Sequence, residues 1–249
     1  MPDIGGELLV LLITAFFMFV TGGIVKGTLG VGLPLVVVPL LSLLFDSSKA
    51  IGLLVMPVLV SNALQSIEGG RLIFTLRRFG TLIGAQFIAT LLANDWGARL
   101  SPREMNAVIA LTVVSAVAMM LLTPQGEIPK KSEWWLGPVV GVIAGAMGGA
   151  SSLTGPILIT YLMALRLDKD DFVGSISIIY LLGSIPMYAA MLIWGRFGLN
   201  EVAWSCAGLL PMYLGLKIGV VLRKRLSEDG FRRILMGFLI FLAMLLVLK

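Results

Sequence analysis

Histidine is absent from this 249-residue sequence, and cysteine occurs once, at Cys206, within an apolar run. Without histidine, the chain lacks the commonest metal ligand and general base in proteins. A single cysteine provides neither a disulfide framework nor a thiolate metal cluster. The glycine-rich segments are not followed by Lys-Ser or Lys-Thr, the pattern that holds nucleotide phosphates. We therefore expect neither an enzyme nor a bound cofactor or metal.

Charged residues are scarce as well. They make up 13% of the chain, whereas 58% of it is hydrophobic, and the mean hydropathy is +0.99. A soluble domain averages about 25% charged residues. The net charge of +5 comes from basic residues at the ends of apolar runs, which the positive-inside bias predicts without a nucleic-acid partner. The composition thus predicts an all-α integral membrane protein embedded in the lipid bilayer.

Short polar breaks separate eight apolar runs. The runs cover residues 8–45, 50–66, 79–94, 105–122, 134–165, 172–194, 202–222 and 231–248. A membrane crossing requires roughly 20 apolar residues, so the runs 8–45 and 134–165 are too long for one crossing. Each of them is interrupted by a cluster of glycines with a proline. We expect each long run to enter and leave on one side as a re-entrant hairpin of two half-length helices, with its tip at the glycines.

The two halves of the chain show similar features in the same order. Each half has one broken run followed by three ordinary runs. The matched positions are Gly27 with Gly145, Gly30 with Gly148, Pro34 with Pro156 after an insertion of four residues, Gly70-Arg71 with Gly195-Arg196, and Arg99-Leu100-Ser101 with Arg225-Leu226-Ser227. We infer an internal duplication, with repeats at 1–125 and 126–249.

The distribution of basic residues favours the hairpin arrangement. With the N-terminus outside, twelve of the 19 Lys and Arg residues lie in inside loops, five lie outside, and Lys26 and Lys217 lie within the membrane. If each long run crossed once, the better orientation would place ten inside and seven outside, a weaker positive-inside bias. Each half then has five membrane-entering segments, so the second half is inverted. Inverted repeats with broken helices are typical of secondary transporters.

The hairpin tips are the best candidates for a binding site. The free N–H groups at the start of a returning helix form a ready anion site. Lys26 lies about 18 residues into an apolar run and has no acidic neighbour in sequence. We interpret it as a cation that faces a water-filled cavity and pairs with an anionic substrate. The alternative is a lysine that snorkels to the interface or supports the tip.

Polar residues of other runs add to this candidate site. Asn62 and Gln65, one helical turn apart, are expected to point into the same cavity, although buried amides also join helices to each other. The full set of candidate substrate-binding residues is Lys26, Gly27, Thr28, Gly30, Gly32, Asn62, Gln65, Gly148, Gly149, Ser151, Ser152 and Thr154. Gln86 and Tyr180 are secondary candidates, and Lys217 is close enough to a basic cluster to snorkel. No Asp or Glu lies clearly mid-membrane, so a side-chain proton relay has no obvious carrier.

Around these residues the sequence resembles the TauE/SafE family, the sulfite exporters. The resemblance rests on the paired tips, G-I-V-K-G-T-L-G-V-G-L-P-L-V-V-V-P at 23–39 and G-V-I-A-G-A-M-G-G-A-S-S-L-T-G-P at 141–156, and it covers essentially the whole chain. It implies transport of sulfur-containing anions such as sulfite, thiosulfate, sulfoacetate and related organosulfonates. It also implies residence in the bacterial cytoplasmic (inner) membrane. The first tip departs from the glycine triplet often seen in the family, reading G-V-G after Leu29.

These observations predict a secondary transporter that holds a small sulfur-containing anion between the two tips and works by alternating access. A passive anion channel or facilitator with the same site is the main alternative, and a transporter of small carboxylates is another. A membrane enzyme fits less well, because the chain offers no nucleophile with a base and no metal cluster. The sequence leaves open which anion moves, its direction, the coupling, and whether the protein forms a homodimer.

Overall fold

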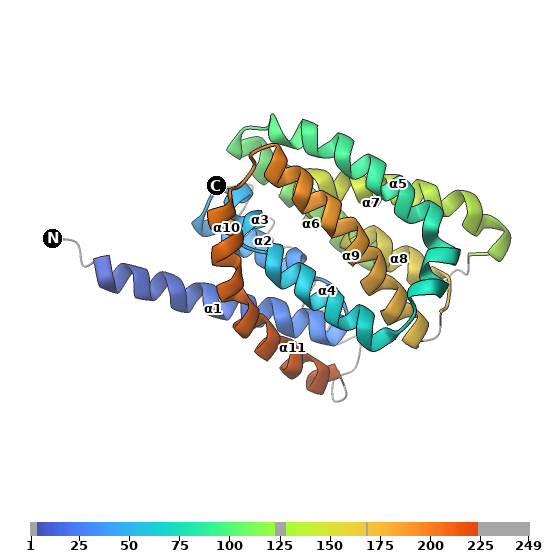
Figure 1. Ribbon diagram of the computed structural model, residues 1–249, viewed down its shortest axis with the longest axis horizontal. Coiled ribbons are helices and arrows are strands. Elements are labelled where there is room, and N and C mark those ends of the chain that lie inside the picture. Colours follow the sequence, from blue (N-terminus) through green and yellow to red (C-terminus); the bar gives the residue numbers. More distant parts are fainter. Residues whose placement is uncertain (1–3, 123–127, 168, 224–249) are drawn as a thin grey trace.

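The computed structural model describes residues 4–122, 128–167 and 169–223 (Figure 1). This part of the chain is helical and has no strand. Its elements are α1 (Ile4–Leu29), α2 (Leu33–Leu44), α3 (Ser47–Gly52), α4 (Val55–Gly69), α5 (Leu72–Ala98), α6 (Pro102–Leu122), η1 (Lys130–Ser132), α7 (Glu133–Ser151), α8 (Gly155–Ala164), α9 (Lys169–Ile193), α10 (Leu199–Ser205), η2 (Cys206–Gly208) and α11 (Leu209–Arg223).

Within the part of the chain that the structure describes, six stretches are long and apolar enough to cross a membrane. They are Leu9–Thr28, Ser47–Ile67, Leu72–Ala98, Lys130–Ser151, Gly174–Ile193 and Leu199–Leu222. The predicted class of an all-α integral membrane protein is therefore confirmed. The last predicted run, 231–248, lies outside the described residues.

Both long apolar runs fold as helical hairpins. The first reverses at residues 30–32, where Gly30 and Gly32 have φ values of 78° and 103°. The second reverses at residues 152–154, where Ser152 has a φ value of 65°. The returning helices are short, with 12 residues in α2 and 10 in α8. The expectation of two half-length arms is wrong for the first arms, because α1 and α7 continue for 26 and 19 residues.

Most glycines in these hairpins serve close packing between helices. On α7, Cβ atoms at Gly141, Gly145 and Gly149 would lie 2.3, 2.4 and 2.5 Å from carbonyl oxygens of α5. On α1, Cβ atoms at Gly23 and Gly27 would lie 2.3 and 2.2 Å from carbonyl oxygens of α11. Small residues let membrane helices approach in this way. The glycine clusters thus dock each hairpin on another helix, and the helix ends only after them.

These helix pairs join the two halves of the chain. The α1–α2 hairpin packs on α11, and the α7–α8 hairpin packs on α5, so each hairpin contacts the second ordinary run of the other half (Figure 1). The helices α4 and α9 lie antiparallel, because Gln65 bonds to Ser177 at 3.4 Å and Arg71 pairs with Asp171 at 2.7 Å. Since α4 and α9 follow the hairpins in their respective halves, this arrangement is what an inverted duplication predicts.

The two tips have corresponding backbones. Gly30 and Ser152 both adopt the left-handed conformation, and each precedes a buried apolar residue, Val31 and Leu153 respectively. Val31 packs among residues of α5, α7, α8 and α9, whereas Leu153 packs in a core made mostly by α2, α3 and α6. Each tip is therefore anchored mainly in the other half. When Gly30 is aligned with Ser152, Pro34 aligns with Pro156 directly. The insertion of four residues that the glycine match required is then unnecessary.

Candidate functional site

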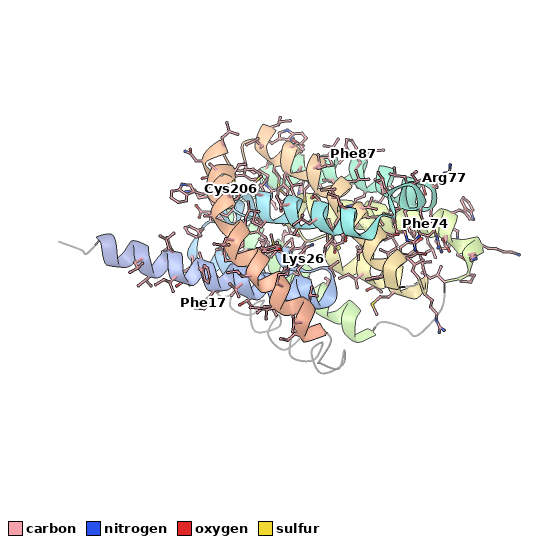
Figure 2. All side chains as sticks on the ribbon, turned by 60° about the horizontal axis from the view of Figure 1, so that its bottom comes forward. Phe17, Lys26, Phe74, Arg77, Phe87 and Cys206 are labelled. Carbon is pink, nitrogen blue, oxygen red and sulfur yellow. The ribbon has the colours of Figure 1, made fainter. Side chains whose placement is uncertain are left out.

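Lys26 lies in the last turn of α1, near the middle of the molecule (Figure 2). Its side chain is 2% exposed, so it does not reach the surface as a snorkelling lysine would. The ammonium donates a 2.7 Å hydrogen bond to Oδ1 of Asn62 on α4. No carboxylate of the described residues forms an ion pair with it. Because an unpaired buried charge is strongly unfavourable, an anion is the partner that would balance this site.

Polar side chains of α4 and α9 lead from this ammonium to the second tip. Asn62 and Gln65 lie one helical turn apart on α4, and Oε1 of Gln65 accepts a 3.4 Å hydrogen bond from Ser177 of α9. One turn further along α9, the buried hydroxyl of Tyr180 lies beside Gly155 at the start of α8, 2.7 Å from where a Cβ of that glycine would be, and it has no hydrogen-bond partner among the described residues. The interface between α4 and α9 thus provides a polar connection between the two hairpin tips.

Both returning helices begin inside the protein without a side-chain cap. Gly32 precedes α2 and Thr154 precedes α8, and neither forms a capping side-chain hydrogen bond. Both residues are buried. The first N–H groups of a helix have no partner within the helix and lie at the positive end of its dipole. These two N-termini can therefore bind an anion.

The tip hydroxyls are partly engaged in local hydrogen bonds. Thr28 and Ser151 donate to the carbonyl oxygens four residues earlier, at 2.7 and 2.8 Å. The hydroxyl of Ser152 lies 3.4 Å from that of Tyr188. A hydroxyl that donates to the backbone has no second proton to offer. Thr28 and Ser151 are therefore positioned to stabilise the tips, and Ser152 and Thr154 are better placed to donate to a ligand.

The predicted tip glycines fall into two groups. Gly30 and Gly32 form the first turn through their left-handed backbones. Gly27 and Gly149 contact neighbouring helices. Gly148 faces Thr154, the N-cap of α8, and a Cβ at Gly148 would lie 2.2 Å from the Thr154 methyl carbon. The glycines of the second group position the tips, because the absence of a side chain lets neighbouring groups pack against them.

Arg196, between α9 and α10, is a residue that positions the second tip, and the sequence did not reveal it. It is 8% exposed, and its guanidinium donates to the carbonyl oxygens of Gly149 at 2.7 Å and Ala150 at 3.0 Å and to Asn94 at 3.2 Å. Burial lowers the pKa of Arg196 to about 10, so it stays charged at neutral pH. A cation at a helix C-terminus is favourable, and Arg196 thereby holds the end of α7. In the sequence, the only feature that singled out Arg196 was its match with Arg71 in the first repeat. Arg71 is half exposed, so the match did not indicate burial.

Gln86 and Thr90, one turn apart on α5, are both 1% exposed. Neither the amide of Gln86 nor the hydroxyl of Thr90 has a side-chain hydrogen-bond partner among the described residues. The amide occupies the space beside Gly183 of α9, where a Cβ would lie 2.1 Å from Nε2. Buried polar atoms without partners are rare, so Gln86 stays a secondary candidate, although its amide is packed against α9. Lys217 is exposed and lies over the ring of Tyr213, away from these groups.

A scan against protein-family models matches residues 14–246 to a family described as sulfite exporter TauE/SafE. The matched segment includes both hairpins and the helices that follow them. No curated protein and no solved structure matches the chain.

Proposed function

Because this chain belongs to the sulfite exporter TauE/SafE family, a family of membrane transporters, we propose that it is a secondary transporter of small sulfur-containing anions. The proposed substrates are sulfite, thiosulfate, sulfoacetate or related organosulfonates. The observation that carries the choice of an anion is Lys26, a buried ammonium bonded to a neutral amide and to no carboxylate of the described residues.

The anion is held between the two hairpin tips. The ammonium of Lys26 balances its charge, and Asn62 orients that ammonium through their 2.7 Å hydrogen bond. The uncapped N-termini of α2 and α8 supply backbone N–H donors for the oxygens of the anion. Ser152 and Thr154 add hydroxyl donors at the second tip. This donor set suits a compact anion with several oxygens.

Transport follows from rocking of one of the two inverted repeats, residues 1–125 and 126–249, or of a mobile bundle of helices, around the site. The antiparallel α4–α9 pair and the docking of each hairpin on the other half support this arrangement. Because each hairpin packs closely on a helix of the other half, the moving bundle combines helices of both repeats. We place the protein in the bacterial cytoplasmic membrane, with its N-terminus outside.

The test is sulfite flux in sealed proteoliposomes that contain the purified protein. Lys26→Met removes the charge and keeps the length of the side chain. We expect it to lower flux by about thirtyfold or more, as for truncating one member of a buried charge pair. Lys217→Met is the matched control, because Lys217 is exposed, and it should retain flux. Normal flux by a folded Lys26→Met protein would reject the role of this residue.

A passive channel with the same site is the alternative mechanism. An alternating-access transporter speeds up labelled-sulfite entry when unlabelled sulfite is present on the other side, and a channel does not. A panel of sulfonates and carboxylates of equal size, tested as inhibitors of this exchange, defines the chemical class. Stronger inhibition by carboxylates would overturn the choice of sulfur oxyanions.

A further inference from the structure

Two glycines on one face of α5 leave open space at the position where a side chain would be. At Gly80 and Gly84 a Cβ atom would have no heavy atom within 4 Å. By contrast, Gly145 and Gly149 of α7 fit against backbone of α5. Glycine within a helix is destabilising relative to alanine. Packing within the described fold therefore does not account for Gly80 and Gly84.

One end of this face opens into a hollow of about 510 Å³, lined by Ile73, Phe74, Arg77 and Arg78. Arg78 forms a two-point ion pair with Glu133, at 2.7 and 2.9 Å, and lies 5.8 Å from the centre of the Phe74 ring. Arg77 is exposed and has no ion pair or side-chain hydrogen bond to any residue that the structure describes. The hollow thus combines apolar walls with one uncompensated cation.

The hollow and the two glycines form one continuous surface. Arg77, Gly80, Gly84 and Phe87 follow one another at steps of three or four residues, which places them on the same side of a helix. Phe87 is 45% exposed and closes the far end of this stripe. In Figure 2, Phe74 and Arg77 lie together near one end of the molecule, and Phe87 lies further along α5.

We propose that this surface binds an anionic phospholipid from the membrane leaflet at the end where α5 begins. The lipid phosphate pairs with Arg77 at the mouth of the hollow, since a guanidinium forms paired, charge-assisted hydrogen bonds with phosphate. One acyl chain lies in the shallow channel left by Gly80 and Gly84 and ends against Phe87. Basic residues at a membrane surface attract anionic lipids, which agrees with the charge of this site.

A second copy of the chain is the other occupant that a Gly-x-x-x-Gly face could take. In a symmetric contact between two α5 helices crossing at Gly80 and Gly84, the two Arg77 side chains would lie one turn from the crossing. Like charges at that separation repel each other, and the described residues provide no carboxylate beside Arg77 to compensate. An anionic lipid removes this conflict, so the charge favours lipid over a dimer.

Native mass spectrometry of the full-length protein, purified in a neutral detergent, tests the proposal. Phosphatidylglycerol and phosphatidylcholine with identical acyl chains are the two probes. We expect the protein to retain phosphatidylglycerol preferentially, and Arg77→Gln to lower this preference by about fivefold, the change expected for one basic group. Arg103→Gln, at an exposed arginine in the first turn of α6, should keep the preference. Gly84→Leu should lower the binding of both lipids, whereas Ala203→Leu on exposed α10 should not.

Two results would overturn the proposal. One is an equal loss of preference in the Arg77 and Arg103 variants, which would show a general surface attraction. The other is a dimer that persists without lipid and dissociates on Gly84→Leu, which would assign the surface to a second copy. The Lys26→Met protein should keep the preference for phosphatidylglycerol, so the lipid site and the transport site are tested separately.

Discussion

Lys26 and Arg196 are both buried cations, but their surroundings differ. Arg196 donates from its two terminal nitrogens to two backbone carbonyl oxygens and one side-chain amide, and only its Nε–H has no partner among the described residues. Lys26 donates to a single amide oxygen in the described structure, although an ammonium has three protons to donate. Arg196 is therefore a structural group, whereas Lys26 keeps donors for a ligand.

Asn62→Asp would supply the carboxylate that is missing beside Lys26. The new ion pair competes with the substrate anion, so we expect sulfite flux to fall by about thirtyfold or more. The thermal unfolding temperature should stay constant or rise, because the buried ammonium gains a counter-charge. Asn200→Asp, on an exposed position, is the control for the added negative charge. Full flux by Asn62→Asp would contradict an anion beside Lys26.

Arg196→Ala removes the group that holds the end of α7. The loss of charge-assisted hydrogen bonds to buried carbonyl oxygens should lower the free energy of unfolding by at least about 2 kcal/mol, measured by thermal unfolding in detergent. Arg196→Lys should restore only part of it, because an ammonium lacks the planar fork of a guanidinium. Arg99→Ala, which breaks an exposed pair with Asp95, should change stability by less than about 1 kcal/mol.

The sequence revealed some of these residues and not others for physical reasons. A lysine and two amides within apolar runs stand out, because such groups are rare in membranes. Lys26 and Asn62 contact each other directly, and the cavity that both were predicted to face stays a prediction. Arg196 lies beside a polar break, where a basic residue is ordinarily at the surface, so only the folded backbone shows that it turns inward.

At the scale of whole helices, the hydropathy pattern predicted the positions of the elements well. It did not predict that α1 and α7 are uninterrupted through their glycine clusters. Glycine supports both tight turns and close helix packing, and sequence alone does not separate the two uses. The contacts of Gly27 and Gly149 with neighbouring helices distinguish them from Gly30 and Gly32, which turn the chain.

Replacing a packing glycine by alanine should destabilise the helix pair. A Cβ at Gly145 would lie 2.4 Å from a carbonyl oxygen of α5, and such overpacking costs about 1–3 kcal/mol. Gly80→Ala is the matched control on α5, where open space surrounds the new methyl group. It should leave stability unchanged or raise it by up to about 1 kcal/mol. Equal melting temperatures for the two variants would contradict the close α5–α7 contact.

At the scale of the whole molecule, the sequence predicts a duplication, which stays a prediction, but it does not fix the register in which the two repeats align. Gly23 and Gly27 of α1, and Gly141, Gly145 and Gly149 of α7, recur every four residues. Shifting the alignment of the two tip sequences by four residues therefore still places most of these glycines opposite one another. The left-handed residues Gly30 and Ser152 define the register in the structure, because backbone conformation changes abruptly at one position.

The proposed orientation can be tested with single cysteines in a Cys206→Ser protein. Ser101→Cys lies before α6 and Lys131→Cys lies before α7, both at exposed positions. The positive-inside rule places the first outside and the second inside. A membrane-impermeant maleimide added to intact cells should label Ser101→Cys alone, and both should react after the membrane is permeabilised. Labelling of Lys131→Cys alone would reverse the orientation.

The docking of α1 on α11 also affects how the protein is made. The ribosome synthesises α1 first among the described helices, but α11, whose backbone fits Gly23 and Gly27, emerges last. The α5–α7 pair has both members as soon as α7 is complete. Assembly can therefore begin in the middle of the chain and finish when its early and late helices meet. A nascent chain that stops before α11 would leave the glycine face of α1 without its intended neighbour.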